Sequence, residues 1–176
     1  MVSRAGRQLG SRITSILDYH FTHLVEDTDM NNLIPLTAPE VKALVVDWYK
    51  KLDAHAPMVE LLPMLADQDL EMRFPEGTVR GHAGFESWYE GVIRIFFDEV
   101  HELKQVEITI AREQADVRLV VNWQAHRWKP PAPKSEWLAF DAAQQWVVKR
   151  LPNSNRPVVV TYIVEGLTPV PGSASL

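Results

Sequence analysis

The sequence has 176 residues, 46% of them hydrophobic and 23% charged, which is the size and composition of one globular domain. A net charge of −5 without a lysine and arginine cluster argues against nucleic-acid binding, and no stretch approaches the roughly 18 apolar residues of a membrane span. The absence of cysteine excludes disulfides, thiolate catalysis and cysteine-based metal sites. We therefore expect a cytoplasmic protein that binds neither nucleic acid nor a membrane.

Residues 1–37 are predicted to be an N-terminal extension, in which residues 13–25 could form a short helix. The start of this segment is basic but lacks the apolar core of a secretory signal. His20 and His23, with Glu26 and Asp29, have the spacing of metal ligands. No supporting pattern surrounds them, so we expect neither a metal nor a cofactor.

The main helix is predicted to begin at residue 38. Thr37 and Glu40 have the spacing of a capping box, and Pro39 occupies the first turn, where a missing N–H is tolerated. Tyr49 lies at the edge of the apolar stripe, a position from which it could line a cavity. The stripe itself has helical spacing and consists of Val41, Leu44, Val45, Trp48 and Leu52.

A short helix over residues 58–62 is predicted between Pro57 and Pro63. The alternation of residues 70–74 predicts a strand, which runs into a turn at residues 75–78.

A third helix is predicted after Gly81. We assign Phe85 and Phe96 to the core, whereas Trp88 and Tyr89 are better candidates for a pocket because their polar tips need partners when buried. The apolar face of this helix comprises Phe85, Trp88, Tyr89, Val92 and Phe96.

Long strands dominate the second half of the chain, and long strands in a meander bend around whatever fills their concave side. We predict an α+β fold: a cone-shaped barrel made of a strongly bent antiparallel or mixed sheet, wrapped on about three N-terminal helices and holding an internal pocket. The domain is expected to span residues 38–168, with a flexible tail at 169–176. The predicted strands are 100–111, 115–129, 136–150 and 157–168.

Tryptophan occurs on both faces of the predicted sheet. Trp123 and Trp146 alternate onto faces opposite to Trp128 and Trp137, respectively. A sheet that is wet on one side would have a polar outer face. We therefore expect a cavity on one face and a partner subunit on the other, in a homodimer that associates through the sheet.

The histidines give no clear catalytic pattern. His126 shares a strand face with Asn122 and Gln124, and we expect this face to lie in the dimer interface. His55, His82 and His101 lie near element ends and are expected to be exposed. Because nucleophile-elbow, phosphate-loop and zinc-protease motifs are absent from the sequence, acid–base chemistry or binding remains.

Three segments carry a resemblance to a known family: MLADQDLEMRFP at residues 64–75, GTVRG at 77–81 and FESWY at 85–89. They resemble the SnoaL-like branch of the nuclear transport factor two-like superfamily, over residues 38–168. The resemblance implies a cystatin-like cone, usually dimeric, with a pocket between helices and sheet. Its members include cyclases, isomerases, dehydratases, epoxide hydrolases and non-catalytic binders, so the fold does not choose the activity.

Comparison with the ketosteroid isomerases of this superfamily implies roles for four residues. Tyr49 falls on their oxyanion-binding tyrosine and Tyr89 on a supporting tyrosine. Gln144 replaces the aspartic acid that donates a second hydrogen bond, and Phe74 replaces the general-base aspartate. A phenylalanine cannot accept a proton, so steroid isomerisation is not expected.

The sequence thus predicts a protein that binds a small, apolar, carbonyl-bearing molecule. The pocket residues are Tyr49, Phe74, Trp88, Tyr89, Gln144 and Trp146. An acid–base enzyme of the cyclase, dehydratase or isomerase kind is the first alternative, with Tyr49, Glu165 or His126 as catalytic candidates. A structural dimerisation module is the second alternative.

Overall fold

The computed structural model describes residues 34–152 and 154–176, and Pro35–Leu176 form one compact unit. The helix predicted over residues 13–25 and the histidines and acids at positions 20–29 lie outside the described residues. Within the described part of the chain, no helix is long and apolar enough to cross a membrane.

The described elements follow the predicted order, with helices early and four long strands at the end. The helices are α2 (Ala38–Asp53), α3 (Met58–Leu61), a 3₁₀ turn η1 (Leu62–Met64) and α4 (Gly81–Ile95). The strands are β1 (Glu71–Phe74), β2 (Gly77–Arg80), β3 (Phe96–Ala111), β4 (Gln114–Arg127), β5 (Glu136–Arg150) and β6 (Pro157–Pro169).

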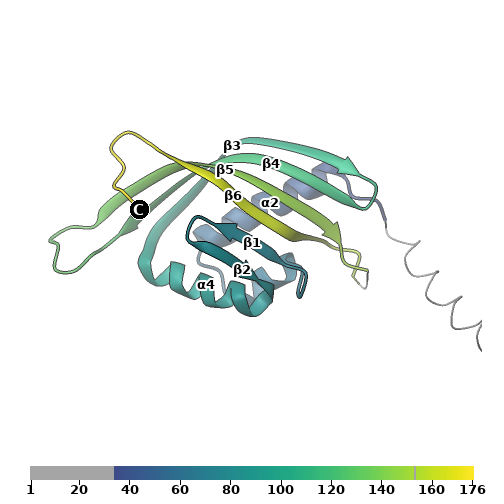
Figure 1. Ribbon diagram of the computed structural model, residues 1–176, viewed down its shortest axis with the longest axis horizontal. Coiled ribbons are helices and arrows are strands. Elements are labelled where there is room, and N and C mark those ends of the chain that lie inside the picture. The colour runs from purple at the N-terminus through teal and green to yellow at the C-terminus, as the bar shows by residue number, and fades with distance from the viewer. Residues whose placement is uncertain (1–33, 153) are drawn as a thin grey trace, which may run out of the picture. The chain divides into compact units, whose positions relative to one another are not determined.

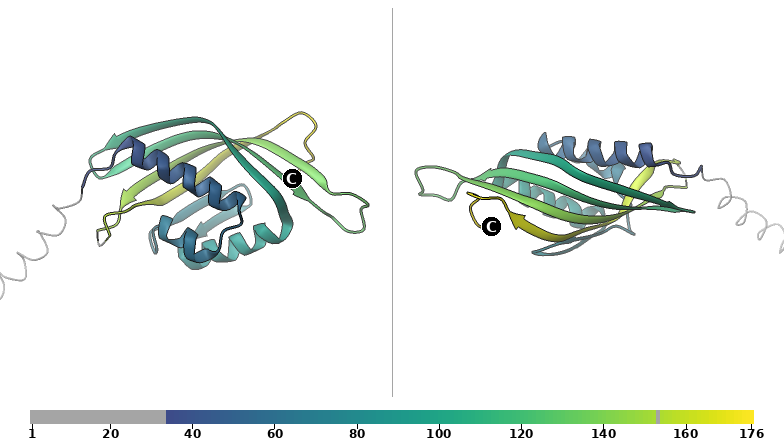
Figure 2. Two further views of the ribbon diagram at one scale, coloured as in Figure 1. Left: turned by 180° about the vertical axis from the view of Figure 1, so that it is seen from behind. Right: turned by 90° about the horizontal axis from the view of Figure 1, so that it is seen from above.

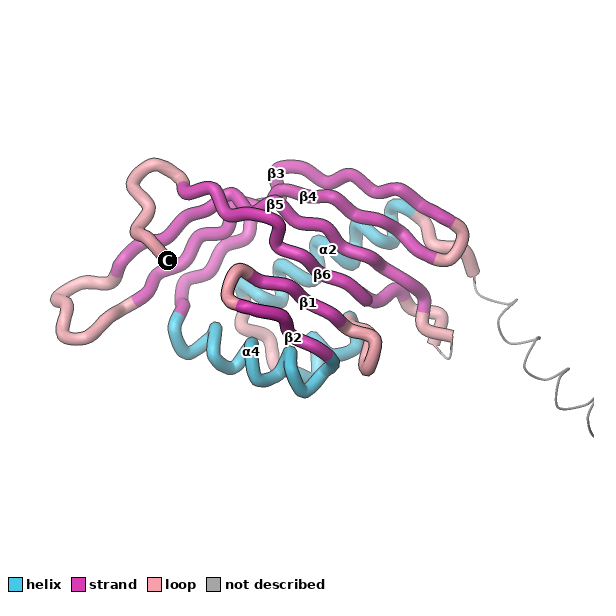
Figure 3. The backbone as a smooth tube through the Cα atoms, in the orientation of Figure 1, coloured by secondary structure: helices cyan, strands magenta, loops and turns pink. Residues whose placement is uncertain are grey.

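The six strands form one mixed sheet in the order β2-β1-β6-β5-β4-β3 (Figures 1 and 3). The β1–β6 pair is parallel and the other pairs are antiparallel. Figure 2 shows the long strands bending over α2 and α4, which lie on the concave side of the sheet. The sheet is open, with β2 and β3 at its edges. The predicted α+β cone with a mixed sheet is confirmed.

Helix α2 buries the predicted stripe, and Tyr49 is buried together with it. Only half of the predicted capping box forms: Thr37 makes no side-chain capping bond, but the Glu40 carboxylate accepts a bond from the Thr37 backbone. Glu40 also forms an ion pair with Arg150 of β5, whose Nη1 lies 2.7 Å from the Glu40 carboxylate. This hydrogen bond holds the pKa of Glu40 below its usual value and ties the start of α2 to the sheet.

Residues 77–80 form the additional strand β2 rather than a simple turn, since Met72 and Val79 are paired across a β1–β2 hairpin. Phe96, expected on the face of the third helix, is the first residue of β3. The helix ends there because the backbone of Phe96 adopts an extended conformation.

The C-terminal segment, predicted to be flexible, follows the edge of β5 beyond the end of β6. The N–H groups of Val170 and Ala174 donate to the carbonyls of Ala139 and Trp137, both at 2.9 Å. The Arg127 guanidinium donates to the Ser175 carbonyl at 2.7 Å. These hydrogen bonds hold the segment against β4 and β5. Its composition, rich in proline, glycine and serine, gave no sign of them.

Candidate active site

A cavity of about 520 Å³ lies between the helices and the concave face of the sheet. Its walls are mainly apolar or aromatic, and they are formed by residues from α2, α4 and five of the strands. The apolar and aromatic lining includes Leu52, Phe74, Trp88, Phe96, Val121 and Trp123. The polar lining includes Glu76, Tyr89, Glu99, His101, Gln144 and Tyr162.

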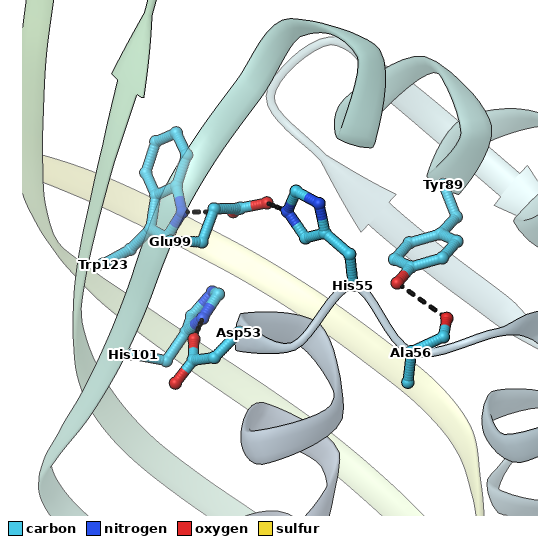
Figure 4. Close-up of polar contacts among 7 residues, drawn as sticks. All are labelled: Asp53, His55, Ala56, Tyr89, Glu99, His101 and Trp123. Carbon is cyan, nitrogen blue, oxygen red and sulfur yellow. Dashed lines mark hydrogen bonds and ion pairs between the residues drawn. The ribbon is translucent and has the colours of Figure 1, made fainter.

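The first acid–histidine pair joins the last residue of α2 to β3. His101 Nδ1 lies 2.7 Å from Asp53 Oδ1 (Figure 4), and the His101 side chain is only 10% exposed. An ionised carboxylate only accepts hydrogen bonds, so Asp53 places the imidazole proton on Nδ1 and leaves the lone pair on Nε2. The ring of Tyr49 stacks on His101 with centroids 4.9 Å apart and restricts the orientation of the imidazole.

The second acid–histidine pair is formed by Glu99 and His55 (Figure 4). His55 Nε2 lies 2.9 Å from Glu99 Oε1, and Trp123 Nε1 donates to Glu99 Oε2 at 2.8 Å. The Glu99 side chain is 6% exposed, so the carboxylate lies in the cavity wall rather than in solvent. A buried carboxylate needs such partners, because an unpaired one would be strongly disfavoured.

Irregular backbone positions this second pair. His55 and Asp98 are non-glycine residues with positive φ, at 47° and 52°, a region that costs side-chain-bearing residues energy. The β3–β4 register gains one residue in β3 between Phe97 and Val100. This bulge allows Phe96 and Glu99, three residues apart, to face the same cavity.

Tyr89 extends from α4 toward the loop that follows α2. Its hydroxyl donates to the carbonyl of Ala56 at 3.0 Å (Figure 4). Burial and the negative charge of Glu99 raise the pKa of Tyr89 to about 12. The phenol is therefore protonated at neutral pH and acts as a hydrogen-bond donor.

A phenol–amide cluster lies farther along the sheet. Gln144 Oε1 accepts bonds from the Tyr49 hydroxyl and from Trp146 Nε1, both at 2.9 Å. Burial raises the pKa of Tyr49 well above its usual value and that of Tyr162 to about 12. These groups mainly satisfy one another, and Tyr49 and Trp146 lie behind the cavity lining.

Four of the six predicted pocket residues line the cavity: Phe74, Trp88, Tyr89 and Gln144. Phe74 stacks on Trp88 with centroids 4.0 Å apart and an interplanar angle of 9°. Trp88 Nε1 donates to Glu76 at 2.9 Å. Whether these residues bind a ligand stays a prediction.

Two of the catalytic candidates lie elsewhere. Glu165 is exposed and accepts a bond from Gln145 on the outer face of the sheet. His126 stacks on Phe97, with ring centroids 5.8 Å apart. Neither residue is part of the cavity lining, so the geometry gives them no role in chemistry there.

The acid–histidine residues were missed as a group. His101 was expected to be exposed and is nearly buried, because the bent β3 brings it under the end of α2. The available signal was the alternation of Glu99 and His101, which places both on one strand face. Their partners Asp53 and His55 are more than 40 residues away in sequence. In the described ranges, no group of three or more histidines and acids could hold a metal ion.

No family model and no curated protein matches the sequence. Several solved structures are similar to this chain. A protein of unknown function with a cystatin-like fold from Nostoc punctiforme is 14% identical, with 81% of this chain and 100% of that chain covered and a TM-score of 0.60. A scytalone dehydratase-like protein from Novosphingobium aromaticivorans is 17% identical, with 89% and 93% covered and a TM-score of 0.62.

A third similar structure is a hexachlorocyclohexane dehydrochlorinase, LinA type 2. It is 12% identical, with 78% of this chain and 91% of that chain covered and a TM-score of 0.63. At these identities the likeness concerns the fold. The chain therefore has a cystatin-like cone fold, which is also the fold of nuclear transport factor two-like proteins, and this fold is the one that the sequence resemblance predicted.

Proposed function

We propose that this protein is an acid–base enzyme of the isomerase or lyase kind, which removes a proton from carbon in a small and largely apolar substrate. The observation that carries the proposal is that His101, paired with Asp53, lines a mainly apolar and aromatic cavity. His101 is the base and Asp53 is its positioning residue.

The chemistry follows from the hydrogen bond at Nδ1. With that nitrogen protonated, Nε2 of the neutral imidazole takes the substrate proton, and the resulting imidazolium is stabilised by the Asp53 carboxylate. The nearly buried position of the His101 side chain strengthens this electrostatic interaction. Histidine is the side chain that most often serves as a general base near neutral pH.

The names of two similar structures are compatible with this reaction class. A dehydrochlorinase and a dehydratase each remove a small molecule from the substrate. Such eliminations require a base that takes a proton from carbon. At 12% and 17% identity this is support for a class of reaction and not for a substrate.

The test is proton exchange at carbon. We expect the protein to accelerate deuterium incorporation next to the carbonyl in at least one of a panel of cyclic ketones that includes 2-indanone and 2-tetralone, followed by NMR. His101→Ala should return the rate to background, whereas His126→Ala, a histidine on the outer face, should match the wild type. If no ketone is accelerated, or if His101→Ala is as fast as the wild type, the proposal is wrong.

A non-catalytic binder of an apolar carbonyl compound is the second candidate, and the aromatic walls of the cavity favour it. A binder would shift its melting temperature with such ketones without accelerating exchange. A dimerisation module with a filled core is less well supported, because it leaves a 520 Å³ cavity unexplained.

We also propose a homodimer that associates through the outer sheet face. This face includes Asn122, which donates to Asp141 at 2.7 Å and accepts from Gln124 at 2.8 Å. Half-buried aliphatic residues such as Val120 and Ile163 accompany them. Light scattering at micromolar concentration should give twice the 20.1 kDa chain mass, and a monomer would contradict the proposal.

A further inference from the structure

The Glu99 carboxylate is not needed for proton removal by His101, yet it is a costly feature of the cavity wall. It is nearly buried, and its placement involves two left-handed residues, His55 and Asp98, and a strand bulge. Strain of this kind persists where the surrounding structure holds it in place, and it is concentrated at functional sites. A simple structural ion pair would not require the carboxylate to line the cavity.

The carboxylate has acceptor capacity beyond its partners in the protein. Each of its oxygens receives one hydrogen bond, from His55 on one side and Trp123 on the other. A carboxylate offers about four lone-pair sites in all. Because Glu99 lines the cavity, the remaining sites are positioned to accept a bond from a molecule inside it.

The position of Glu99 relative to His101 restricts which part of the substrate can carry the group that donates a hydrogen bond to Glu99. The two residues face the cavity from alternate positions of β3, so their backbones are about 7 Å apart. Both side chains can contact one small molecule. A donor held at Glu99 would therefore lie only a few bonds from the carbon that His101 deprotonates.

The surroundings favour a hydroxyl as the donor. An ammonium carries three N–H donors and needs several acceptors. The neighbouring lining residues Phe96 and Trp123 offer aromatic surface, and Trp123 uses its only donor on Glu99 itself. A hydroxyl needs one acceptor, which Glu99 supplies.

We propose that Glu99, positioned by His55 and Trp123, is a specificity-determining residue that accepts a hydrogen bond from a substrate hydroxyl. The substrate class is then a small cyclic compound that carries a hydroxyl close to the carbon losing its proton. The inference rests on the proposed function for the location of that carbon, but the recognition of the hydroxyl is a matter of binding alone.

The test measures binding by calorimetry with three probes that share one skeleton: indane, 1-indanol and 1-aminoindane. For the wild type we expect 1-indanol to bind about tenfold more tightly than indane, as hydrogen bonds to charged groups are among the stronger ones. Glu99→Gln should remove most of this difference and leave the affinity for indane unchanged. Glu102→Gln, the same change at an exposed position of β3, should preserve it.

Three outcomes would overturn the inference. The first is equal or absent binding of 1-indanol and indane to the wild type, a comparison that needs no variant to fold. The second is an equal loss of both ligands in Glu99→Gln, which indicates a structural role. The third is tighter binding of 1-aminoindane than of 1-indanol. Proton exchange without a hydroxyl preference would refute this inference alone, whereas a hydroxyl preference without exchange would refute only the proposed enzyme.

Discussion

The cavity is bordered by two polar clusters that differ in how their hydrogen bonds are used. In the phenol–amide cluster, the Gln144 oxygen is occupied by Tyr49 and Trp146, and burial raises the pKa of Tyr49. In the acid–histidine region, each Glu99 oxygen accepts one bond from the protein, His101 is bonded at Nδ1, and both residues line the cavity. Polar groups that satisfy one another hold the fold together, whereas polar groups with spare capacity are available to a ligand.

The largest effect should come from Asp53→Asn. An asparagine amide can donate to Nδ1 of His101, which favours the tautomer with its proton on Nε2 and removes the base. We expect the exchange rate to fall by about 10²- to 10⁴-fold, with little change in stability. Asp47→Asn, at an exposed position of the same helix, is the matched control. A histidine NMR spectrum of Asp53→Asn with Nδ1 still protonated would contradict this account.

The next largest effect should come from Gln144→Leu. This change leaves the buried Tyr49 hydroxyl and Trp146 N–H without their acceptor, at about 1–3 kcal/mol for each unsatisfied group. We expect the free energy of unfolding to fall by about 2–4 kcal/mol in urea titrations. Gln145→Leu, one residue along on the outer face, should change it by about 0.5 kcal/mol or less. A stable Gln144→Leu that has lost ligand binding would show that the phenol–amide cluster is part of the binding site.

The smallest effect concerns Tyr89, a phenol beside the acid–histidine region. Its pKa of about 12 lies above the unfolded value near 10, so between these values only the unfolded state loses the proton. The contribution of Tyr89 to the free energy of unfolding should be constant below pH 10 and then fall as pH rises towards 12. Tyr89→Phe should make this decline shallower by about 1.4 kcal/mol per pH unit. An unchanged slope would mean that Tyr89 ionises normally in the folded protein.

Periodicity alone predicted much of the scaffold. The apolar stripe of α2 and the alternation in β4 and β5 are local signals, and burial in the structure follows them. The family resemblance aligned Tyr49 and Gln144 with residues that act together, and their side chains are 2.9 Å apart. The stripe and the alternation follow the regular repeats of a helix and a strand, and the spacing of apolar residues in a sequence indicates those repeats.

The acid–histidine pairs could not be predicted in the same way. Asp53 and His101 are 48 residues apart, and their contact depends on how far the sheet bends. His55 depends on a left-handed backbone, which histidine adopts more readily than most residues, but the sequence does not show which histidine adopts it. Glu165 was one of two candidates for the base, together with His126, but the strand alternation left the face of Glu165 undetermined.

The irregularities of β3 affect how this protein can be compared with others. Besides the extra residue between Phe97 and Val100, the strand carries a second one between Leu103 and Gln105. Glu99 lies within the first of these bulges, and His101 lies between the two. In an alignment with a protein whose strand lacks either bulge, a missing single-residue gap would shift the positions of Glu99 and His101 while leaving most of the strand plausible. In divergent relatives the site is thus where sequence comparison is weakest, and superposed structures are needed to find the corresponding residues.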